Sequence, residues 1–512
     1  VAAALAVRGV VPRSAVVIAL PTGPDLVASY LAALLLGAVP ALASTPTQRV
    51  RDADVYRDLL AGIVRDARAR AVVCDLPTAA LLVPGGGESF DGATLVTQLT
   101  TAPRPRGVGD TRVASLDPDE VATIQYSSGS TGRPKGVRLT HRAMLNNVRA
   151  VRAALALGPD DVSVNWIPLY HDMGLIDALL VPLLCGCETV LLPTGDFVRE
   201  PRLWLEAITH HRGTISWAPN FAYALCVQRI PEHEIAGLDL SSWRLALNAA
   251  EPIVPETIAA FCERFAAAGF RDGAMTPAWG LAENVTIATV HPPGEPPRIE
   301  RIDRAAAAAG RAVAVSDDAR GFGCVAVGRP LPGCKLEIRD GVHPLGERAI
   351  GDVWLSSDSA FAGYDDAAAA RPHDGTPVWL PTGDRGYVAD GDLFFVARAR
   401  DVIVIAGEKH APHDVEAAIN AVPGVRPGCA AAFGVRDEAR GTEALAAVVE
   451  TRVEDAAERA RLARAIRSQV TRVTGLALRH LTLVPPGGVK KTTSGKLARA
   501  ATRAAYAEEA RA

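Results

Sequence analysis

The sequence lacks the patterns that mark small metal-binding, redox and nucleic-acid-binding proteins. Its eight cysteines include no Cys-x-x-Cys pair, so a zinc ribbon or a thioredoxin motif has no support. Lysine and arginine number 54 against 57 aspartate and glutamate residues, a net charge of −3, which argues against a nucleic-acid partner or an anionic membrane. Aromatic residues make up only 5% of the 512 residues, but 49% are hydrophobic. The chain can therefore fill several cores, at roughly 150 residues per folding unit.

No basic segment precedes an apolar core at the start of the chain, so we expect no signal peptide. The stretch from Leu26 to Gln48 has no charged residue and reaches the roughly 20 residues that span a bilayer. Gly37, Pro40 and Pro46 interrupt it, which predicts a buried helix at Leu26–Leu36 followed by a loop, and no integral membrane segment. Cysteines in apolar runs are typical of free buried thiols, so we expect a reducing, cytoplasmic location.

Short apolar runs alternate with helical stretches through most of the chain. This alternation predicts an α/β fold, with a large N-terminal domain of mixed or parallel sheets flanked by helices. The predicted strands are Val16–Leu20, Ala71–Cys74, Ala122–Tyr126, Thr189–Leu192, Thr214–Trp217 and Trp243–Leu247, and the predicted helices are Arg142–Leu155, Leu203–His211, Asn220–Gln228 and Pro255–Ala268.

After about residue 320 the strand-like runs come closer together, with Pro and Gly between them. This predicts a small β-rich subdomain at about 320–399, in which Asp390-Gly391 forms a hairpin turn. The charged run Arg398–Asp401 marks a boundary, so we expect an N-terminal domain of 1–399 and a small mobile C-terminal α/β lid of 400–512. A long helix is predicted at about Val453–Val473, with Leu462, Ile466, Val470 and Val473 on one stripe.

The strongest chemical signal is a loop rich in Ser and Gly that ends in a lysine, between a predicted strand and a predicted helix. Small residues let the backbone approach a polyphosphate, and hydroxyl and N–H groups donate to it. Pro134 stands where a Walker A loop needs Gly, so the loop is not that motif, and a plain linker is the alternative interpretation. The candidate phosphate-binding residues are Ser127, Ser128, Gly129, Ser130, Thr131, Gly132 and Lys135.

This loop is similar to the signature of acyl-adenylate-forming enzymes, which include acyl-CoA synthetases, adenylation domains of nonribosomal peptide synthetases and luciferases. Four further blocks resemble the family's motifs in the right order: Trp279-Gly280-Leu281-Ala282-Glu283, Pro381-Thr382-Gly383-Asp384, Arg398-Ala399-Arg400-Asp401 and Thr493-Ser494-Gly495-Lys496. Five ordered blocks make chance a poor explanation.

A narrower resemblance is to the fatty acyl-AMP ligases. It rests on Trp166–Ile176 (Trp-Ile-Pro-Leu-Tyr-His-Asp-Met-Gly-Leu-Ile), Ala218–Tyr223, Leu238–Arg244 and Asn248–Pro252. The resemblance implies a ligase that uses ATP and Mg²⁺ to convert a carboxylic acid, fatty or related, into an acyl adenylate and pyrophosphate. It also implies that the acyl group passes to the phosphopantetheine thiol of an acyl carrier protein, in place of free CoA.

The resemblance assigns catalytic roles to three residues. Lys496 is expected to bridge the carboxylate and the α-phosphate, Glu283 to hold Mg²⁺ together with Thr131, and His171 to orient the acid. These types suit the reaction, because it brings anions together and a hard cation prefers oxygen ligands. The ordinary alternatives are an exposed lysine, a residue capping a helix N-terminus and a core histidine.

The resemblance also assigns a nucleotide site. Asp384 is expected to accept hydrogen bonds from both ribose hydroxyls, with Arg398 as a second contact, although a surface charge is the alternative for Arg398. Small residues around the adenine leave room for a flat ring, and Trp279 is expected to stack near it. The residues of this region are Asn248, Ala249, Ala250, Glu251, Trp279, Gly280, Leu281 and Ala282.

Arg400 stands at the family's hinge, about which the lid rotates between the two half-reactions. The acyl pocket is expected near Trp217, Phe221, Met173 and Gly174. A Trp at 217, where the family often has a small residue, could shorten the acyl tunnel. Other departures are Trp279 in place of the usual Tyr and Glu408-Lys409-His410 after the hinge. The family's insertion, which restrains the lid, is expected at about Arg298–Asp318.

Three rival functions stay open at this point. An acyl-CoA synthetase would share the same residues and differ in its thiol acceptor. An adenylating enzyme for a short or unusual acid, in polyketide or nonribosomal peptide biosynthesis, is also possible, but Ser216-Trp217-Ala218 lacks the Asp that pairs an amino-acid substrate's amine. A non-catalytic relative that binds nucleotide or a carrier protein is disfavoured, because Lys496, Asp384 and Glu283 are all present.

Overall fold

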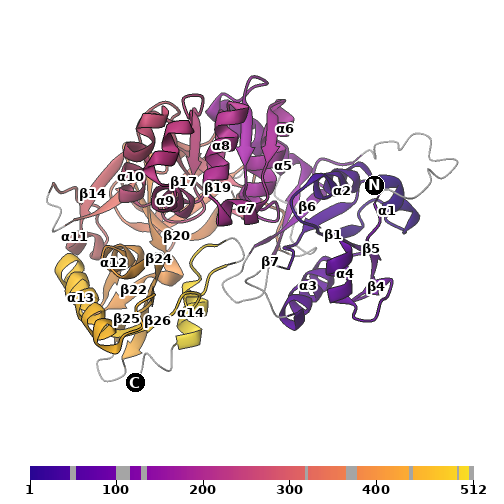
Figure 1. Cartoon of the computed structure of the whole chain (residues 1–512). Helices are drawn as coiled ribbons and strands as arrows, with labels where there is room; N and C mark the ends of the chain where they lie inside the picture. Colours follow the sequence, from indigo (N-terminus) through magenta and orange to yellow (C-terminus); the bar gives the residue numbers. More distant parts are fainter. Residues whose placement is uncertain are drawn as a thin grey trace.

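The computed structural model describes residues 1–46, 53–99, 116–127, 135–316, 321–364, 378–437, 442–492 and 495–506. An N-terminal α/β part with its own sheet lies to the right in Figure 1, next to a larger central part with a second sheet. The C-terminal segment, in gold, packs below the central part. The functional cavity described below opens where these parts meet.

The first sheet confirms the predicted α/β pattern. Its strand order is β2-β1-β3-β5-β4, parallel except for the last pair. The predicted helix at Leu26–Leu36 is confirmed as α2, but the loop expected after it is wrong, because β2 begins there and pairs with β1. Pro40 is tolerated because β2 is an edge strand of this sheet. The elements are α1 (Ala2–Val7), β1 (Ala15–Ala19), α2 (Pro24–Leu35), β2 (Val39–Leu42), α3 (Ala53–Ala67), β3 (Ala71–Cys74), α4 (Leu76–Leu82), β4 (Ser89–Phe90) and β5 (Ala93–Val96).

The second sheet has the order β16-β13-β12-β11-β10-β8-β9, and its run from β9 to β12 is parallel. Its predicted strands and helices are all present, with boundaries shifted by a few residues. The elements are α5 (His141–Leu155), β8 (Val162–Asn165), the π-helix η1 (Met173–Leu180), α6 (Val181–Cys185), β9 (Glu188–Leu191), α7 (Thr194–Arg199), α8 (Arg202–His211), β10 (Ile215–Ala218), α9 (Asn220–Arg229), η2 (Glu232–Gly237), β11 (Leu245–Asn248), α10 (Pro255–Phe265), η3 (Ala266–Ala268), η4 (Asp272–Ala274), β12 (Met275–Gly280), η5 (Ala282–Asn284), β13 (Ile287–Val290) and β16 (Arg329–Pro330).

The sequence predicted that the Ser/Gly loop runs from a strand into a helix, and this prediction is wrong. The loop connects β6 (Val121–Ser127) to β7 (Lys135–Thr140), and these two strands pair antiparallel. Helix α5 begins only after β7, where the Thr140 hydroxyl accepts a hydrogen bond from the Ala143 amide and caps the helix. The described segments on either side of the loop are therefore two paired strands, and α5 does not follow the loop directly.

A five-stranded antiparallel sheet, in the order β18-β17-β19-β20-β21, forms the predicted β-rich region. Asp390 and Gly391 connect β20 to β21, both with positive φ (53° and 84°), as the Asp-Gly pair predicts for a two-residue turn. The elements are β14 (Ile299–Asp303), α11 (Arg304–Ala308), β15 (Gly321–Val325), β17 (Cys334–Asp340), β18 (His343–Pro344), β19 (Gly351–Ser357), β20 (Leu380–Ala389), β21 (Asp392–Arg398) and η6 (Ala399–Asp401).

The C-terminal segment is α/β, with a sheet in the order β24-β25-β26 covered by two helices. The predicted long helix is α13, which Asp455 caps at its start and Gly475 ends with φ 75°. Its buried stripe is Leu462, Ile466 and Val470. The elements are β22 (Ile403–Ile405), β23 (Glu408–His410), α12 (Pro412–Asn420), β24 (Val425–Asp437), β25 (Thr442–Thr451), α13 (Ala456–Thr474), β26 (Leu478–Val484) and α14 (Arg499–Tyr506).

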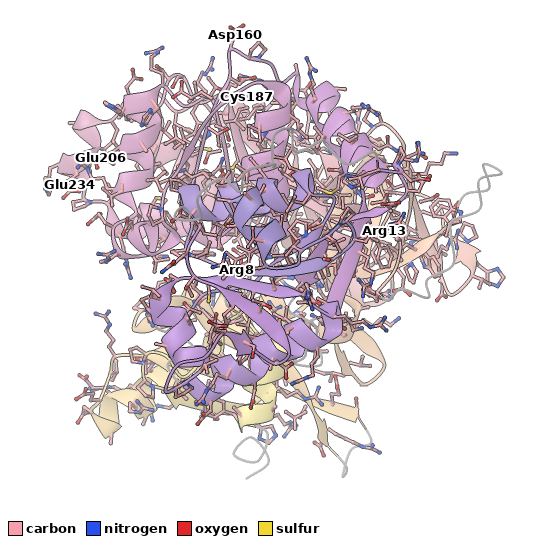
Figure 2. All side chains as sticks on the ribbon, turned by 90° about the vertical axis from the view of Figure 1, so that its right-hand side faces the viewer. Arg8, Arg13, Asp160, Cys187, Glu206 and Glu234 are labelled. Carbon is pink, nitrogen blue, oxygen red and sulfur yellow. The ribbon has the colours of Figure 1, made fainter. Side chains whose placement is uncertain are left out.

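The fold is held mainly by its apolar cores. Surface charges often form ion pairs: Glu206 and Glu234, labelled near each other in Figure 2, both form ion pairs with Arg202. Exposed pairs of this kind contribute only about 0–1 kcal/mol each. All eight cysteines are free, and seven are buried. Among the helices that the structure describes, none has the length and apolar character needed to cross a membrane.

Candidate active site

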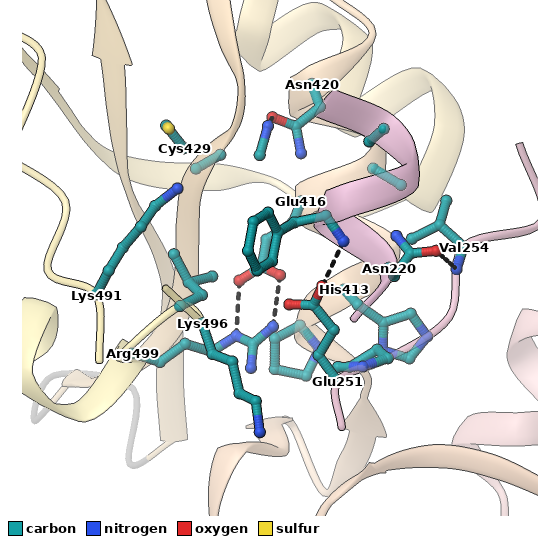
Figure 3. Close-up of a pocket in the computed structure, with 18 of the residues that line it drawn as sticks. Asn220, Glu251, Val254, His413, Glu416, Asn420, Cys429, Lys491, Lys496 and Arg499 are labelled. Carbon is teal, nitrogen blue, oxygen red and sulfur yellow. Dashed lines mark hydrogen bonds and ion pairs between the residues drawn. The ribbon is translucent and has the colours of Figure 1, made fainter. Parts of the chain in front are cut away.

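A cavity of about 2070 Å³ opens between the second sheet, the β-rich region and the C-terminal segment. Its walls carry residues that the sequence assigned to the nucleotide and to catalysis, from both ends of the chain. Figure 3 shows Lys496, Lys491 and Arg499 of the C-terminal segment facing Glu251 and Asn220 of the central part. Residues of the central part and of the C-terminal segment thus both line the cavity. Which side chains face each other depends on how these two parts pack together.

Lys496 is presented to the cavity by a tight backbone turn. The Thr492 amide donates to the Lys496 carbonyl at 2.8 Å, the Gly495 amide donates to the Thr492 carbonyl, and the Lys496 amide donates to the Thr492 hydroxyl. Gly495 has φ 95°, a conformation that favours glycine. Burial lowers the pKa of Lys496, while the charges of Asp172 and Glu251 act in the opposite direction.

His171 and Asp172 stand behind Lys496, immediately before η1. The Lys496 Nζ atom lies 2.8 Å from His171 Nε2, and His171 Nδ1 lies 2.6 Å from Asp172 Oδ1. An imidazole that donates from Nδ1 to Asp172 leaves Nε2 free to accept from the ammonium. Although burial opposes it, His171 and its hydrogen bond, together with the charge of Lys496, hold the pKa of Asp172 well below its usual range.

Asp384 lies on β20, paired in register with Arg398 on β21. It is 3% exposed and lines the cavity. The Trp279 indole Nε1 donates to its Oδ2 at 2.8 Å, and Arg398 Nε lies 3.2 Å from Oδ1. Oδ1 nevertheless has no aligned hydrogen-bond donor among the described residues. A buried acceptor without an aligned donor, on a residue that lines the cavity, is suited to a ligand hydroxyl.

The residues expected around the adenine follow β11. Asn248 and Ala249 are buried, and Ala250 takes φ 74°, which is strained for a residue other than glycine. This turn brings Glu251 to the cavity, where its Oε1 accepts from the Phe221 amide at 2.6 Å. Burial raises the pKa of Glu251. Of the expected set, Ala250, Glu251, Trp279 and Gly280 line the cavity, whereas Asn248, Ala249, Leu281 and Ala282 lie behind its described lining.

Glu283 has a partner that the sequence analysis missed. The Tyr364 hydroxyl donates to Glu283 Oε1 at 2.6 Å, and the Lys135 Nζ atom lies 5.3 Å from the centre of the Tyr364 ring. Pairing of Arg138 with Gly363 fixes Tyr364 beside β7. Tyr364 therefore joins the expected metal ligand to the lysine of the phosphate loop, and no sequence pattern signalled it.

The rest of the predicted phosphate loop cannot be placed. Ser128, Gly129, Ser130, Thr131 and Gly132 lie outside the described residues, as does the side chain of Ser127. Thr131, the second expected metal ligand, belongs to this group.

Of the four residues predicted for the acyl pocket, only one is among the described residues that line the cavity. Phe221 lines the cavity, but Met173, Gly174 and Trp217 are not among its described lining residues. Trp217 is 1% exposed and packs in the same apolar cluster as Met173. A Cβ atom at Gly174 would lie 2.2 Å from the Pro168 carbonyl oxygen, so close backbone packing requires this glycine. Met173 and Trp217 share their cluster with Tyr170 and Ala250, two residues of the cavity wall.

The hinge region and the expected insertion both contact the C-terminal segment. Arg400 lines the cavity from η6. Arg304, on α11 within the expected insertion, forms a two-bond ion pair with Asp414 of α12 at 2.8 and 2.9 Å. Arg499 similarly bonds Glu416 and Asp401, beside the hinge. The sequence did not indicate these ion pairs, because their partners are far apart along the chain.

Comparison with known proteins identifies the family of this chain. The sequence model of the AMP-binding enzyme family matches residues 1–365. The chain belongs to this family. JamA of Moorena producens (strain JHB), a medium-chain-fatty-acid–[acyl-carrier-protein] ligase, is 32% identical to this AMP-binding enzyme over 95% of this chain and 85% of JamA. A Caulobacter vibrioides relative, also 32% identical over 95% of this chain and 84% of its own length, is provisionally named an acyl-CoA synthetase.

A solved structure from a study of fatty acyl-adenylate ligases of E. coli and L. pneumophila matches this AMP-binding enzyme with a TM-score of 0.91. It is 30% identical, and the match covers 99% of this chain and 90% of that one. The predicted fold class and the resemblance to acyl-adenylate-forming enzymes are therefore confirmed.

Proposed function

We propose that this enzyme activates a fatty or related carboxylic acid with ATP, and then transfers the acyl group to the phosphopantetheine thiol of an acyl carrier protein. The observation that carries the proposal is one cavity lined by the Lys496 ammonium, the buried Asp384 carboxylate and the small side chain of Ala250. These are groups for a carboxylate, a ribose and a flat base. The fatty acyl-AMP ligase relatives support the same assignment.

In the first half-reaction a carboxylate oxygen of the acid attacks the α-phosphorus of ATP, and the bond to pyrophosphate breaks. Two anions must approach each other, so the site needs fixed positive charge. Lys496 supplies that charge, and it holds the carboxylate against the α-phosphate. His171 accepts from Lys496 at 2.8 Å, which keeps the ammonium aimed at the reacting oxygens.

We place Mg²⁺ at Glu283 on the chemistry of its carboxylate. Mg²⁺ usually takes one or two protein carboxylates and completes its shell with phosphate oxygens and water. The described residues contain no group of three His, Cys, Asp or Glu side chains that could hold a metal alone, so a single carboxylate beside bound phosphates fits. When bound, the ion neutralises phosphate charge. Glu283 anchors it, and Thr131 is the second proposed ligand.

In the second half-reaction the thiol attacks the acyl carbon, a thioester forms and AMP leaves. We propose that the chain divides into a domain of 1–399 and a lid of 400–512, and that the lid turns about Arg400 between the two steps. The Lys496–His171 contact crosses that division, so it belongs to the adenylation arrangement. Turning the lid withdraws Lys496 and opens room for the pantetheine arm.

We place the acyl chain against the apolar part of the cavity wall and the whole reaction in the cytoplasm. Phe221, Ala224 and Leu225 of α9 line that part of the cavity, close to Glu251. The free buried cysteines suit a reducing compartment.

One reaction tests the proposal. The enzyme is incubated with Mg-ATP, a pool of acids of graded length and type, free CoA and a phosphopantetheine-loaded carrier protein, and the products are identified by mass spectrometry. We expect acyl-AMP and acylated carrier protein, with the mass of the adenylate identifying the acid. Acyl-CoA as the main product would make the protein a CoA ligase. If no acid in the pool is converted into an adenylate, the result would support the non-catalytic alternative.

A further inference from the structure

Trp279 makes a hydrogen bond inside the nucleotide site that its expected stacking role does not require. Its indole Nε1 donates to Asp384 Oδ2 at 2.8 Å, from β12 to β20, across 105 positions of the chain. Both residues are buried, at 6% and 3% exposure, and both line the cavity. Burial therefore shields the bond from water. In such an environment a hydrogen bond to a carboxylate is strong.

The indole cannot turn away from Asp384. Its ring packs in an apolar cluster with Ala288, Val327 and Val353, which come from β13, the segment before β16, and β19. An indole N–H donates and never accepts, so it holds an acceptor oxygen and nothing else. The cluster thus fixes the donor, and the donor fixes one oxygen of the carboxylate.

The other carboxylate oxygen is left for a ligand. Asp384 Oδ1 has no aligned hydrogen-bond donor among the described residues, although Arg398 Nε lies 3.2 Å away. We propose that Trp279 is a positioning residue for ATP recognition: its indole N–H anchors Asp384 through Oδ2, so that Oδ1 is presented to the ribose hydroxyls. This inference rests on the nucleotide site proposed above.

The electrostatics of the site agree with this arrangement. Burial raises the pKa of Asp384, and the charge of Arg398 and the Trp279 hydrogen bond act against that rise. Arg400 also lowers it, whereas the charge of Glu283 raises it further. Removing the indole N–H leaves burial less opposed, so the pKa of Asp384 rises again. A protonated Asp384 would lose the acceptor strength that a diol requires.

The test replaces the indole and measures ribose recognition. For Trp279→Phe, the KM for ATP and for 2′-deoxy-ATP is measured by ATP–pyrophosphate exchange across a range of pH. We expect the KM for ATP to rise about tenfold, the scale of a lost hydrogen bond to a charged group. The preference for ATP over 2′-deoxy-ATP should fall toward one, and the acid limb of ATP recognition should move to higher pH.

The matched control is Trp243→Phe. Trp243 is also fully buried, and its indole donates to the Leu245 carbonyl at 2.9 Å, in a cluster that does not contain Trp279. We expect this variant to lose stability and to keep the wild-type ATP preference and pH profile. If Trp279→Phe behaves like Trp243→Phe, the indole has only a packing role and the inference is wrong.

Asp384→Asn separates this inference from the proposed function. If it abolishes the preference for ATP over 2′-deoxy-ATP while Trp279→Phe does not, Asp384 recognises ribose without help from Trp279. If it leaves the preference intact, the proposed nucleotide site itself is wrong.

Should Trp279→Phe fail to fold, the wild-type protein still provides a test. One of its seven indole N–H resonances should titrate in step with the acid limb of ATP recognition, and it should move in Asp384→Asn. The absence of such a resonance would overturn the inference.

Discussion

The Lys496 Nζ atom lies 2.8 Å from His171 Nε2, although the two residues stand 325 positions apart. Asp172 continues the chain of contacts, with its carboxylate 2.6 Å from His171 Nδ1. The ammonium is thus held in place before any substrate arrives, by an imidazole nitrogen whose ring is itself held by a partly buried carboxylate. A substrate carboxylate then competes only with an imidazole nitrogen for the Lys496 proton donors, and the ammonium needs little rearrangement.

Lys496→Ala should remove most of the adenylation activity. We expect a loss of about 10²–10³-fold in kcat, the scale seen when a group that stabilises developing charge is deleted, while ATP still binds. Adenylate formation is followed by pyrophosphate exchange, and ATP binding by calorimetry. The control is Lys490→Ala, because Lys490 is exposed and should be replaceable. A near-normal rate of pyrophosphate exchange in Lys496→Ala would show that Lys496 has no catalytic role in adenylation.

Asp172→Asn should change the pH dependence of adenylation. Lys496 must be charged, and its pKa lies below the usual value because of burial, which the charge of Asp172 partly offsets. Activity is therefore present at pH below the pKa of Lys496 and is lost as the pH rises through it. Without the negative charge that pKa falls further, so the alkaline limb of kcat/KM should move to lower pH.

The control for this experiment is Asp177→Asn, on η1. Asp177 is fully buried, accepts a hydrogen bond from Thr286, and burial raises its pKa well above the ordinary value. Burial disfavours its ionised form, and its charge is not among those that shift the pKa of Lys496, so an amide should replace it without moving the alkaline limb. Equal profiles for both variants would show that Asp172 does not act on Lys496.

Local patterns predicted local structure well. The apolar stripe of α13 and the Asp390-Gly391 turn depend on neighbours in the sequence and were predicted correctly, with the helix boundaries shifted by a few residues. Strand β7 was missed because its partners, β6 and Gly363, leave no local pattern, and a short run that leads into a helix looks like the start of that helix.

The side-chain contacts within the site could not be predicted from the sequence, for a related reason. Family resemblance placed Lys496 and His171 near the same carboxylate, but nothing in the chain stated that they touch. Tyr364 could not be found at all, because its place beside Glu283 depends on the pairing of Gly363 with β7. Side-chain partners that are set by tertiary packing leave no periodic signal.

Tyr364→Phe should weaken the response to Mg²⁺. The hydroxyl donates to Glu283 Oε1 and holds that carboxylate in one orientation, so its loss should raise the Mg²⁺ concentration for half-maximal activity several-fold. Saturating Mg²⁺ should restore most of kcat. The control is Tyr223→Phe, which loses a hydroxyl bond to the Leu247 carbonyl in the core. A kcat loss that Mg²⁺ cannot restore would contradict an orienting role.

Trp217→Gly should lengthen the acids that the enzyme accepts. Trp217 is buried in the cluster that also contacts Tyr170 and Ala250, two residues of the cavity wall. Its removal empties a space behind that wall, at a cost of about 3–5 kcal/mol in stability by comparison with other Trp truncations, and the space can take additional methylene groups. Trp217→Leu is the milder variant if the first does not fold.

The measurement for Trp217 is the chain-length profile of adenylate formed from a pool of fatty acids, read by mass spectrometry beside a thermal melt. Phe394→Leu is the control, because Phe394 is equally buried but lies in a cluster that contains none of the cavity-wall residues Tyr170, Ala250 and Phe221. Both leucine variants should melt earlier, since each loses aromatic packing, but only the Trp217 variant should move the profile toward longer acids. If both variants keep the wild-type profile, or both shift it alike, Trp217 does not limit the acyl chain, and the limit must lie in residues that touch the cavity directly, such as Phe221.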